Sequence, residues 1–199
     1  MRIKVVVCLF VCSFAPALAT RAQDINKFDV YAGYSYVRAN PANQPDPLQT
    51  PVPQSIPSFN MNGGGGSFAY NFNGRISGVF DLDRYHSSKL SAPLGNTHGS
   101  MYTFLAGPKL SFRNTTRFTP FTQFLLGAAY SDSFIYLRGP QSALAMTMGG
   151  GFDVRLSHRF SLRPLQADYL LTQFRENIDP APKRWQNNAR LGAGVVAHF

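Results

Sequence analysis

The sequence predicts an all-β protein, an eight-stranded antiparallel up-and-down transmembrane β-barrel, on three observations. Apolar residues alternate with small or polar residues along most of the chain, which is typical of strands whose two faces meet different surroundings. Short turns alternate with long polar connections, as expected when hairpins cross a membrane back and forth. The final segment, 186–199, has an apolar row suited to closing a barrel against the first strand: Ala189, Leu191, Ala193, Val195, Ala197 and Phe199.

An export signal precedes the predicted barrel. A basic start is followed by a short apolar run and an Ala-x-Ala motif, which together indicate a secretory signal peptide. The apolar run is too short to span a membrane as a helix. We expect residues 1–22 to be this signal peptide, cleaved after Ala19 or Ala22, and residues 23–199 to form one outer-membrane barrel domain.

Composition narrows the classes of partner. The chain has 19 Lys and Arg against 10 Asp and Glu, a formal net charge of +9. Because an exported chain rarely meets nucleic acid, we expect anionic lipid headgroups, and no nucleic acid, as the counter-charge. Both cysteines, Cys8 and Cys12, lie in the predicted signal peptide, so the mature chain is expected to contain no disulfide.

The first half of the chain supplies four predicted strands, at 27–38, 60–72, 75–85 and 99–112. In each strand, aromatic and aliphatic residues share one parity, and small or polar residues share the other. The run Gly63 to Gly66 predicts strong bending or a close backbone approach, and Asn73-Gly74 is a strong hairpin signal. Pro108 has no backbone N–H to donate, so we expect a bulge in the fourth strand.

The second half supplies four more predicted strands, at 118–130, 143–156, 160–174 and 186–199. Arg163 falls on the apolar parity of its strand, which conflicts with its charge. Pro164 follows immediately, and we predict a bulge there that returns Arg163 to the polar face.

The predicted connections fall into two groups. Long polar connections are expected at one rim of the barrel, at 39–58, 86–98, 131–142 and 175–185. Short turns are expected at the other rim, at 73–74, 113–117 and 157–159. An even number of strands places both chain ends at the short-turn rim. In transmembrane barrels the long loops are extracellular and the short turns periplasmic.

The polar parity is rich in Gly, Ser, Thr and Ala, with sparse charges of both signs, and it suits a narrow interior better than a water-facing surface. We therefore expect the apolar parity to face lipid. The reverse arrangement, a soluble lipocalin-like carrier with an apolar interior, is the alternative. The charges predicted to form a structural network in the lumen are Asp29, Arg75, Asp81, Asp83, Lys109, Asp153, Arg155, Asp168 and Arg190. The same charges could instead form a gate or an ion path.

Several stretches carry a resemblance to a known family. They are Val30 to Tyr36, Leu105 to Lys109, Pro120-Phe121 with Leu126 to Ala128, Gly149 to Arg155, Gln166 to Tyr169, and the terminal Phe199. In this order they resemble small OmpA/OmpX-type outer-membrane β-barrel proteins. The segment Gly194 to Phe199, with Ala197 inside it, also resembles the C-terminal signal read by the barrel-assembly machinery.

The resemblance implies an isolated barrel in a Gram-negative type of outer membrane. Its expected partners are membrane lipid and lipopolysaccharide, the barrel-assembly machinery during insertion, and an extracellular ligand of the long loops. The family shares no catalytic chemistry, so we expect no catalytic residue and no cofactor, and we expect a monomer. The scattered histidines, His86, His98, His158 and His198, have no metal-ligand spacing.

The predicted function is therefore a non-catalytic structural or surface-interaction role through the extracellular loops. One alternative is a hydrolase that modifies lipid A, because His86-Ser87-Ser88 and His98-Gly99-Ser100 both contain His-x-Ser. This spacing resembles the lipid A deacylase barrel, although a nucleophilic serine also needs a base oriented by a third group. A narrow pore is the other membrane alternative.

Overall fold

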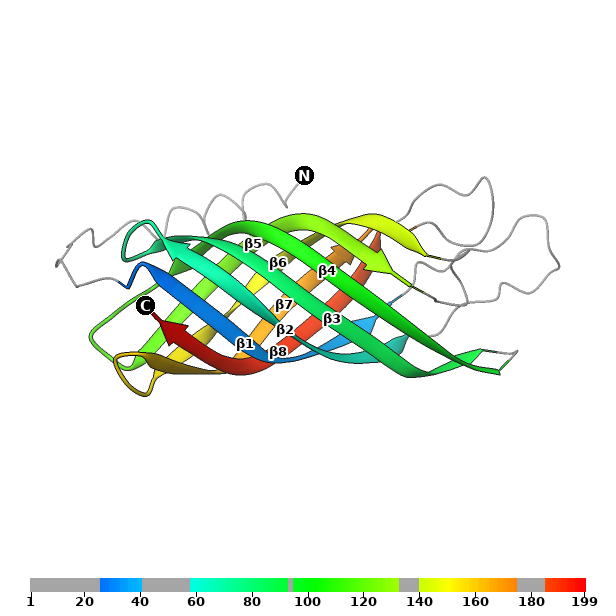
Figure 1. Cartoon of the computed structure of the whole chain (residues 1–199), viewed down its shortest axis with the longest axis horizontal. Helices are drawn as coiled ribbons and strands as arrows, with labels where there is room; N and C mark the ends of the chain where they lie inside the picture. The colour runs from blue at the N-terminus through cyan, green and yellow to red at the C-terminus, as the bar shows by residue number, and fades with distance from the viewer. Residues whose placement is uncertain (1–25, 41–57, 93–94, 133–139, 175–184) are drawn as a thin grey trace, which may run out of the picture.

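The computed structural model describes residues 26–40, 58–92, 95–132, 140–174 and 185–199, with the backbone alone at 88–92 and 95–98. Eight strands form one closed antiparallel barrel in which each strand pairs with the next and β8 pairs with β1 (Figure 1). The strands are β1 (Phe28–Ala39), β2 (Phe59–Asn71), β3 (Ile76–Ala92), β4 (Gly95–Ser111), β5 (Phe118–Ser131), β6 (Gln141–Arg155), β7 (Phe160–Thr172) and β8 (Gln186–His198).

The seam between β8 and β1 closes the barrel as the sequence predicts. The two strands pair without interruption from Asp29↔His198 to Arg38↔Ala189. Beyond the last pair, Phe28 and Phe199 exchange backbone hydrogen bonds, at 3.1 Å and 2.8 Å. A closed seam leaves no unpaired strand edge, which is the condition for placing strands in lipid.

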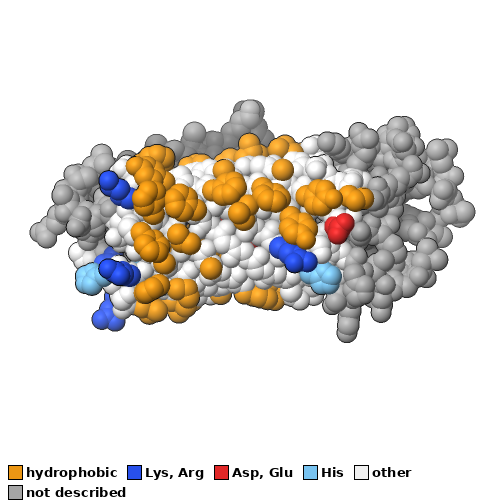
Figure 2. All heavy atoms as spheres, viewed as in Figure 1, with side chains coloured by type: hydrophobic (Ala, Val, Ile, Leu, Met, Phe, Trp, Pro, Cys, Tyr) orange, Lys and Arg blue, Asp and Glu red, His pale blue; other side chains and the backbone are white. Residues whose placement is uncertain are grey.

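The two faces of the strands have the predicted orientation. Tyr34, Phe104 and Leu191 point outward, with 56%, 48% and 45% of their surface exposed, whereas Asp153 and Arg190 point inward, with 8% and 3% exposed. Figure 2 shows apolar side chains across the visible face, with charged side chains toward its two ends. This is the reverse of a soluble carrier barrel, and an apolar surface of this extent is characteristic of a transmembrane barrel. In the described ranges, no helix is long and apolar enough to cross a membrane.

An aromatic cluster marks the outer face near the short-turn rim. The ring of Phe28 lies 5.5 Å from the ring of Phe68 and 5.5 Å from that of Tyr70, and Tyr70 lies 5.2 Å from Phe72 in an edge-on arrangement. Amphipathic and aromatic rings are favoured where the hydrocarbon meets the headgroups. The position is therefore that of an interfacial girdle.

The two proline predictions have different outcomes. At Pro164 a bulge is present, because Arg163 pairs with Gly194 while Gln166 pairs with Gly192. This shift turns Arg163 into the interior, as predicted. At Pro108 the predicted bulge is wrong. Pairing with β3 runs through it without a break, and pairing with β5 is interrupted there but resumes in the same register, so no residue is inserted.

The hairpin of β3 and β4 corrects a second prediction. Segment 86–98 was expected to be a long polar connection, but pairing continues to Ala92↔Gly95 after a register shift between Ser87 and Leu90. In Figure 1 this hairpin extends past the ends of the other strands, on the side away from the C-terminus. A strand with water on both faces keeps its ladder hydrogen bonds but loses the apolar alternation that marks strands in a sequence.

The other connections lie where they were expected. Three further long connections, 40–58, 132–140 and 173–185, join strands at the same rim as the β3–β4 hairpin, and most of their residues lie outside the described part. The short connections 72–75, 112–117 and 156–159 lie at the opposite rim with the C-terminus (Figure 1). In the first of these turns, the Asn73 side-chain oxygen accepts backbone N–H bonds from Arg75 and Ile76, each at 2.8 Å. The predicted signal peptide lies outside the described residues.

Candidate functional site: the barrel interior

Arg190 lies at the centre of a buried ion cluster. Its Nη1 donates to Asp81 Oδ1 at 2.9 Å and to Asp83 Oδ2 at 2.6 Å, and its Nε donates to Asp168 Oδ2 at 2.9 Å. The four side chains come from β3, β7 and β8, so the cluster spans the interior. One guanidinium thus holds three carboxylates in a region of low dielectric constant, where unpaired charges are costly.

Neutral donors complete this cluster. The Tyr85 hydroxyl donates to Asp83 Oδ2 at 2.8 Å, Gln166 Nε2 donates to Asp168 Oδ2 at 2.7 Å, and Gln123 Nε2 donates to Asp168 Oδ1 at 3.3 Å. These contacts spread the negative charge of three carboxylates over more donors than Arg190 alone provides.

The glycine run in β2 makes room for the cluster. A Cβ atom added at Gly65 would fall on the Asp83 carboxylate, and one at Gly66 would lie 2.8 Å from the Tyr31 carbonyl oxygen. The sequence-based prediction of a close approach at Gly63 to Gly66 is therefore confirmed. Glycine is the residue that allows charged side chains to fill so narrow an interior.

Arg163 forms a second buried ion pair, nearer the short-turn rim. Its Nε and Nη2 donate to the two oxygens of Asp153 at 2.7 Å and 3.1 Å, and its Nη1 donates to Gln166 Oε1 at 2.8 Å. The guanidinium carbon lies 4.5 Å from the ring centre of Tyr31 and 4.3 Å from that of Phe121. A bidentate contact and two stacked rings together fix this arginine in one position.

The structure brings together some of the residues predicted for the lumen network and leaves others apart. Asp81, Asp83, Asp168 and Arg190 meet in one cluster, while Asp29, Lys109 and Asp153 are buried nearer the short-turn rim. Arg75 is a correction, because it is exposed in the turn before β3, while Arg155 is exposed at the end of β6 and lines the interior only at the short-turn rim. Asp153 binds Arg163, which the predicted network did not include. Pro164 predicts that Arg163 faces the interior, but it does not identify the partner of Arg163.

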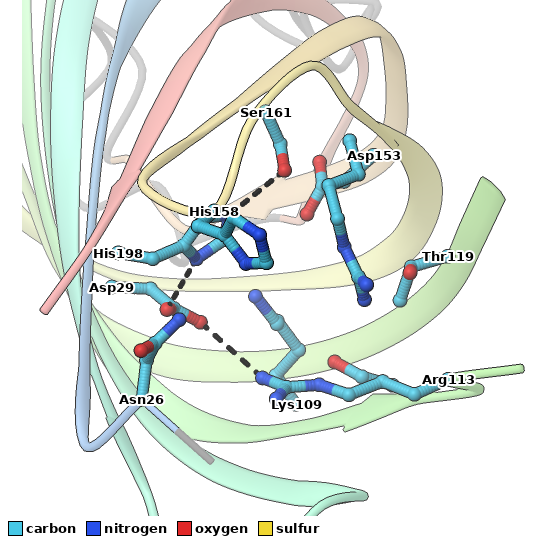
Figure 3. A pocket seen from close by; sticks show the side chains of 11 residues that line it. Asn26, Asp29, Lys109, Arg113, Thr119, Asp153, His158, Ser161 and His198 are labelled. Atoms are coloured by element: carbon cyan, nitrogen blue, oxygen red, sulfur yellow. Dashed lines mark hydrogen bonds and ion pairs between the residues drawn. The ribbon is translucent and has the colours of Figure 1, made fainter. Parts of the chain in front are cut away.

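Asp29 joins the first and last strands at the short-turn rim. Its Oδ1 lies 2.7 Å from His198 Nδ1, and its Oδ2 accepts from Asn71 Nδ2 at 3.0 Å and lies 3.7 Å from Arg113 Nη2. His198 Nε2 in turn lies 2.8 Å from the Ser161 hydroxyl (Figure 3). These contacts link β1, β2, β7 and β8 around the seam.

The C-terminal residues of the predicted assembly signal lie along this seam. Gly194 is opposite Gly33 on β1, and a Cβ atom there would lie 2.7 Å from the Tyr31 ring. Ala197 pairs with Val30, and the Phe199 side chain is exposed on the outside. Recognition of these residues by the assembly machinery stays a prediction.

The other half of the interior is apolar, which the sequence analysis missed. Val37, Met61, Leu105, Leu125 and Leu170 point inward, and water reaches 2% or less of each. Nearer the long-connection rim, the same cluster continues with Phe59, Met101 and Phe174. Among the described residues, this apolar cluster borders the Arg190 cluster, since Leu105 is directly opposite Asp81 in the β3–β4 ladder. Side chains so little reached by water leave no wide aqueous path between them.

A serine and a histidine meet on the outside of the barrel. His86 Nδ1 lies 3.2 Å from Ser100 Oγ, because the two residues are opposite each other in the β3–β4 ladder. The predicted pairs were His86 with Ser88 and His98 with Ser100, and the side chains of Ser88 and His98 lie outside the described part. Within the described ranges, no group of three His, Cys, Asp or Glu residues is placed to hold a metal ion.

No family model matches this chain, and no curated protein matches it by sequence. Similar solved structures exist. Neisserial surface protein A (NspA) is 19% identical, covers 89% of this chain and 100% of its own length, and superposes with a TM-score of 0.58. The outer membrane protein OprG from Pseudomonas aeruginosa is 12% identical, covers 88% of this chain and 96% of its own, and superposes with a TM-score of 0.56.

A third similar structure is Ail, the attachment invasion locus protein of Yersinia pestis. It is 14% identical, covers 88% of this chain and 99% of its own, and superposes with a TM-score of 0.50. Identities this low establish the fold alone. The similarity to small OmpA/OmpX-type barrels that the sequence suggests is thus confirmed in three dimensions: the chain has the fold of the small eight-stranded outer-membrane barrels.

Proposed function

We propose that this protein resides in the outer membrane as a monomeric barrel and has a structural or surface-interaction role without catalysis. The observation that carries the proposal is the combination of an outward apolar belt with an interior filled by ion pairs and apolar side chains. The belt would contact membrane lipid and lipopolysaccharide. Export by the signal peptide at residues 1–22 and insertion by the barrel-assembly machinery would bring it there.

The interaction surface in this proposal is the long-connection rim. The β3–β4 hairpin extends beyond the other strands, and it carries Arg84 on its outer face, over the ring of Tyr102 at 5.5 Å. Arg38 lies on the exposed face near the same rim. Ail has been solved in complex with the heparin analogue sucrose octasulfate. A sulfated polyanion is therefore a reasonable first class of extracellular ligand to test against this basic chain.

Location and topology can be tested together. The protein, expressed with its own leader in a Gram-negative host, should fractionate with the outer membrane and migrate differently on a gel before and after boiling. An epitope inserted between Ala92 and Gly95 should be accessible on intact cells, and one inserted between Asn73 and Gly74 should not. A protein recovered from the soluble periplasm with unchanged mobility contradicts the membrane assignment.

A hydrolase is the second candidate, favoured by the contact between His86 and Ser100. Two members of a nucleophilic site are in contact on the outer face of the barrel, where lipid A chains would pass. Lipid A extracted from cells that express the protein should then show a mass loss of one acyl chain. The loss should disappear in His86→Asn and in Ser100→Ala, but not in Thr122→Ala, which removes an outward hydroxyl elsewhere. Unchanged lipid A with the parent protein excludes this candidate.

A further inference from the structure

A cavity of about 280 Å³ lies inside the barrel at the short-turn rim. It is bordered by the short connections and by the inward side chains of the strands that meet there (Figure 3). By the same measure of volume, one water molecule needs only ~10–15 Å³, so the cavity has room for a small ligand with its hydration. Its cationic side chains are those of Lys109, Arg113 and Arg155.

The two carboxylates that line this cavity are already engaged. Asp153 uses both of its oxygens to hold Arg163, which lies deeper in the interior. Asp29 accepts from Asn71, lies in contact with His198 and is 3.7 Å from Arg113 Nη2. Both carboxylates are therefore held by partners other than Lys109 and Arg155.

Lys109 is the most deeply buried of the three cations that line the cavity. Its side chain is buried, with 5% of the residue exposed, and it points toward the centre of the cavity (Figure 3). Its ammonium nitrogen lies 5.1 Å from the ring centre of Phe121. In the described part of the chain, neither Lys109 nor Arg155 has a carboxylate oxygen within 4.0 Å of its charged nitrogens. A buried ammonium that lacks a direct counter-ion is costly unless another charge or polar ligand compensates it.

We propose that this cavity binds a small multivalent oxyanion of the phosphate class. Lys109 supplies the buried charge, Arg113 and Arg155 supply guanidinium donors at the mouth, and the Ser111 and Thr119 side chains add neutral donors. The anion enters from the short-turn rim, the periplasmic side of a barrel with the proposed orientation. The inference does not depend on the role of the extracellular loops. A free phosphate and the phosphate of a lipid headgroup share this chemistry.

The test is a calorimetric titration of the full mature barrel in a neutral detergent, with inorganic phosphate as the probe and chloride at equal ionic strength as the reference. Lys109→Gln should weaken phosphate binding at least about tenfold, because a charge-assisted contact is lost. Arg159→Gln is the matched control, since it removes one positive charge at the same rim without touching the cavity, and it should leave binding unchanged. Each variant is first checked for folding by its shift in gel mobility.

Several results decide the matter. Binding that Lys109→Gln and Arg159→Gln weaken equally overturns the proposal. A second arm uses the soluble short-chain lipid dihexanoyl phosphatidylglycerol. Binding of phosphate alone, lost with Lys109, assigns a free anion. Binding of the lipid alone, with the same dependence on Lys109, assigns a headgroup. Binding of neither probe again overturns the proposal.

Discussion

Arg190 on β8 donates to Asp81 on β3; the two residues are 109 positions apart in the sequence, and their strands are not neighbours in the barrel. The contact crosses the interior, so it fixes the distance between opposite walls as well as the pairing of adjacent ones. Because Asp83 and Asp168 share the same guanidinium, the loss of this single cation would leave three carboxylates buried together.

Replacing Arg190 by Met should therefore cost about 3–5 kcal/mol of the free energy of unfolding, measured by urea unfolding in lipid vesicles. Arg84→Met removes the same charge from the outer face, where the guanidinium lies over Tyr102, and should cost under about 1 kcal/mol. Similar losses of unfolding free energy in the two variants would mean that the buried cluster does not stabilise the barrel more than a surface arginine does.

The ion pair between Arg163 and Asp153 predicts that substitutions of the two residues have non-additive effects on the free energy of unfolding. Arg163→Ala and Asp153→Ala each leave a buried partner unpaired and should each cost about 3–5 kcal/mol. The double variant removes both charges and should cost clearly less than the sum of the two single changes. The measurement is a double-mutant cycle by urea unfolding, and additive values would contradict the ion pair seen here.

The absence of a side chain at Gly65 can be tested by the substitution to alanine, which adds one methyl group. A Cβ atom at this position would overlap the Asp83 carboxylate, so Gly65→Ala should destabilise the barrel by about 1–3 kcal/mol. Gly192→Ala is the control, because the nearest atoms to its Cβ are 3.5 Å away, at ordinary contact distance. An equal effect of both substitutions would show that loss of glycine flexibility, rather than the overlap, is responsible.

The sequence was sufficient for the architecture because lipid and lumen impose opposite demands on alternate residues. The closing strand, with Leu191 outward and Arg190 inward, shows this directly. The same rule failed for Ser87 to Ala92, where neither face is apolar and no alternation remains to be detected.

Which interior side chains contact each other was harder to predict than which face of a strand each residue occupies. Parity assigns a side chain to the lumen but says nothing about depth, so it could not name the partner of Asp153, to which the bulge at Pro164 brings Arg163. Inward Leu105 and Leu125 were not expected, since leucine on a transmembrane barrel strand is usually lipid-facing. Which lumen residues meet depends on strand stagger, and this requires the three-dimensional register.

The apolar half of the interior predicts the electrical behaviour of the barrel. Leu105, Leu125 and Leu170 are completely shielded from water and fill the interior beside the ion clusters. The purified protein should therefore show no steady ionic conductance in a planar lipid bilayer. A stable, discrete conductance would contradict a filled interior and would favour the pore alternative.

If the outward face of β8 contacts lipid, a charge introduced in the middle of this strand should destabilise the barrel far more than a charge introduced near a rim. Leu191 points outward with Arg190 and Gly192 on either side pointing inward, so Leu191→Arg places a guanidinium in the apolar belt. At the midplane of a bilayer this substitution costs about 2–4 kcal/mol, falling toward zero near the interfaces. Leu156→Arg, beyond the end of β6 at the short-turn rim, should therefore have a much smaller effect. Unfolding in vesicles measures both, and equal costs would mean that Leu191 does not contact the hydrocarbon.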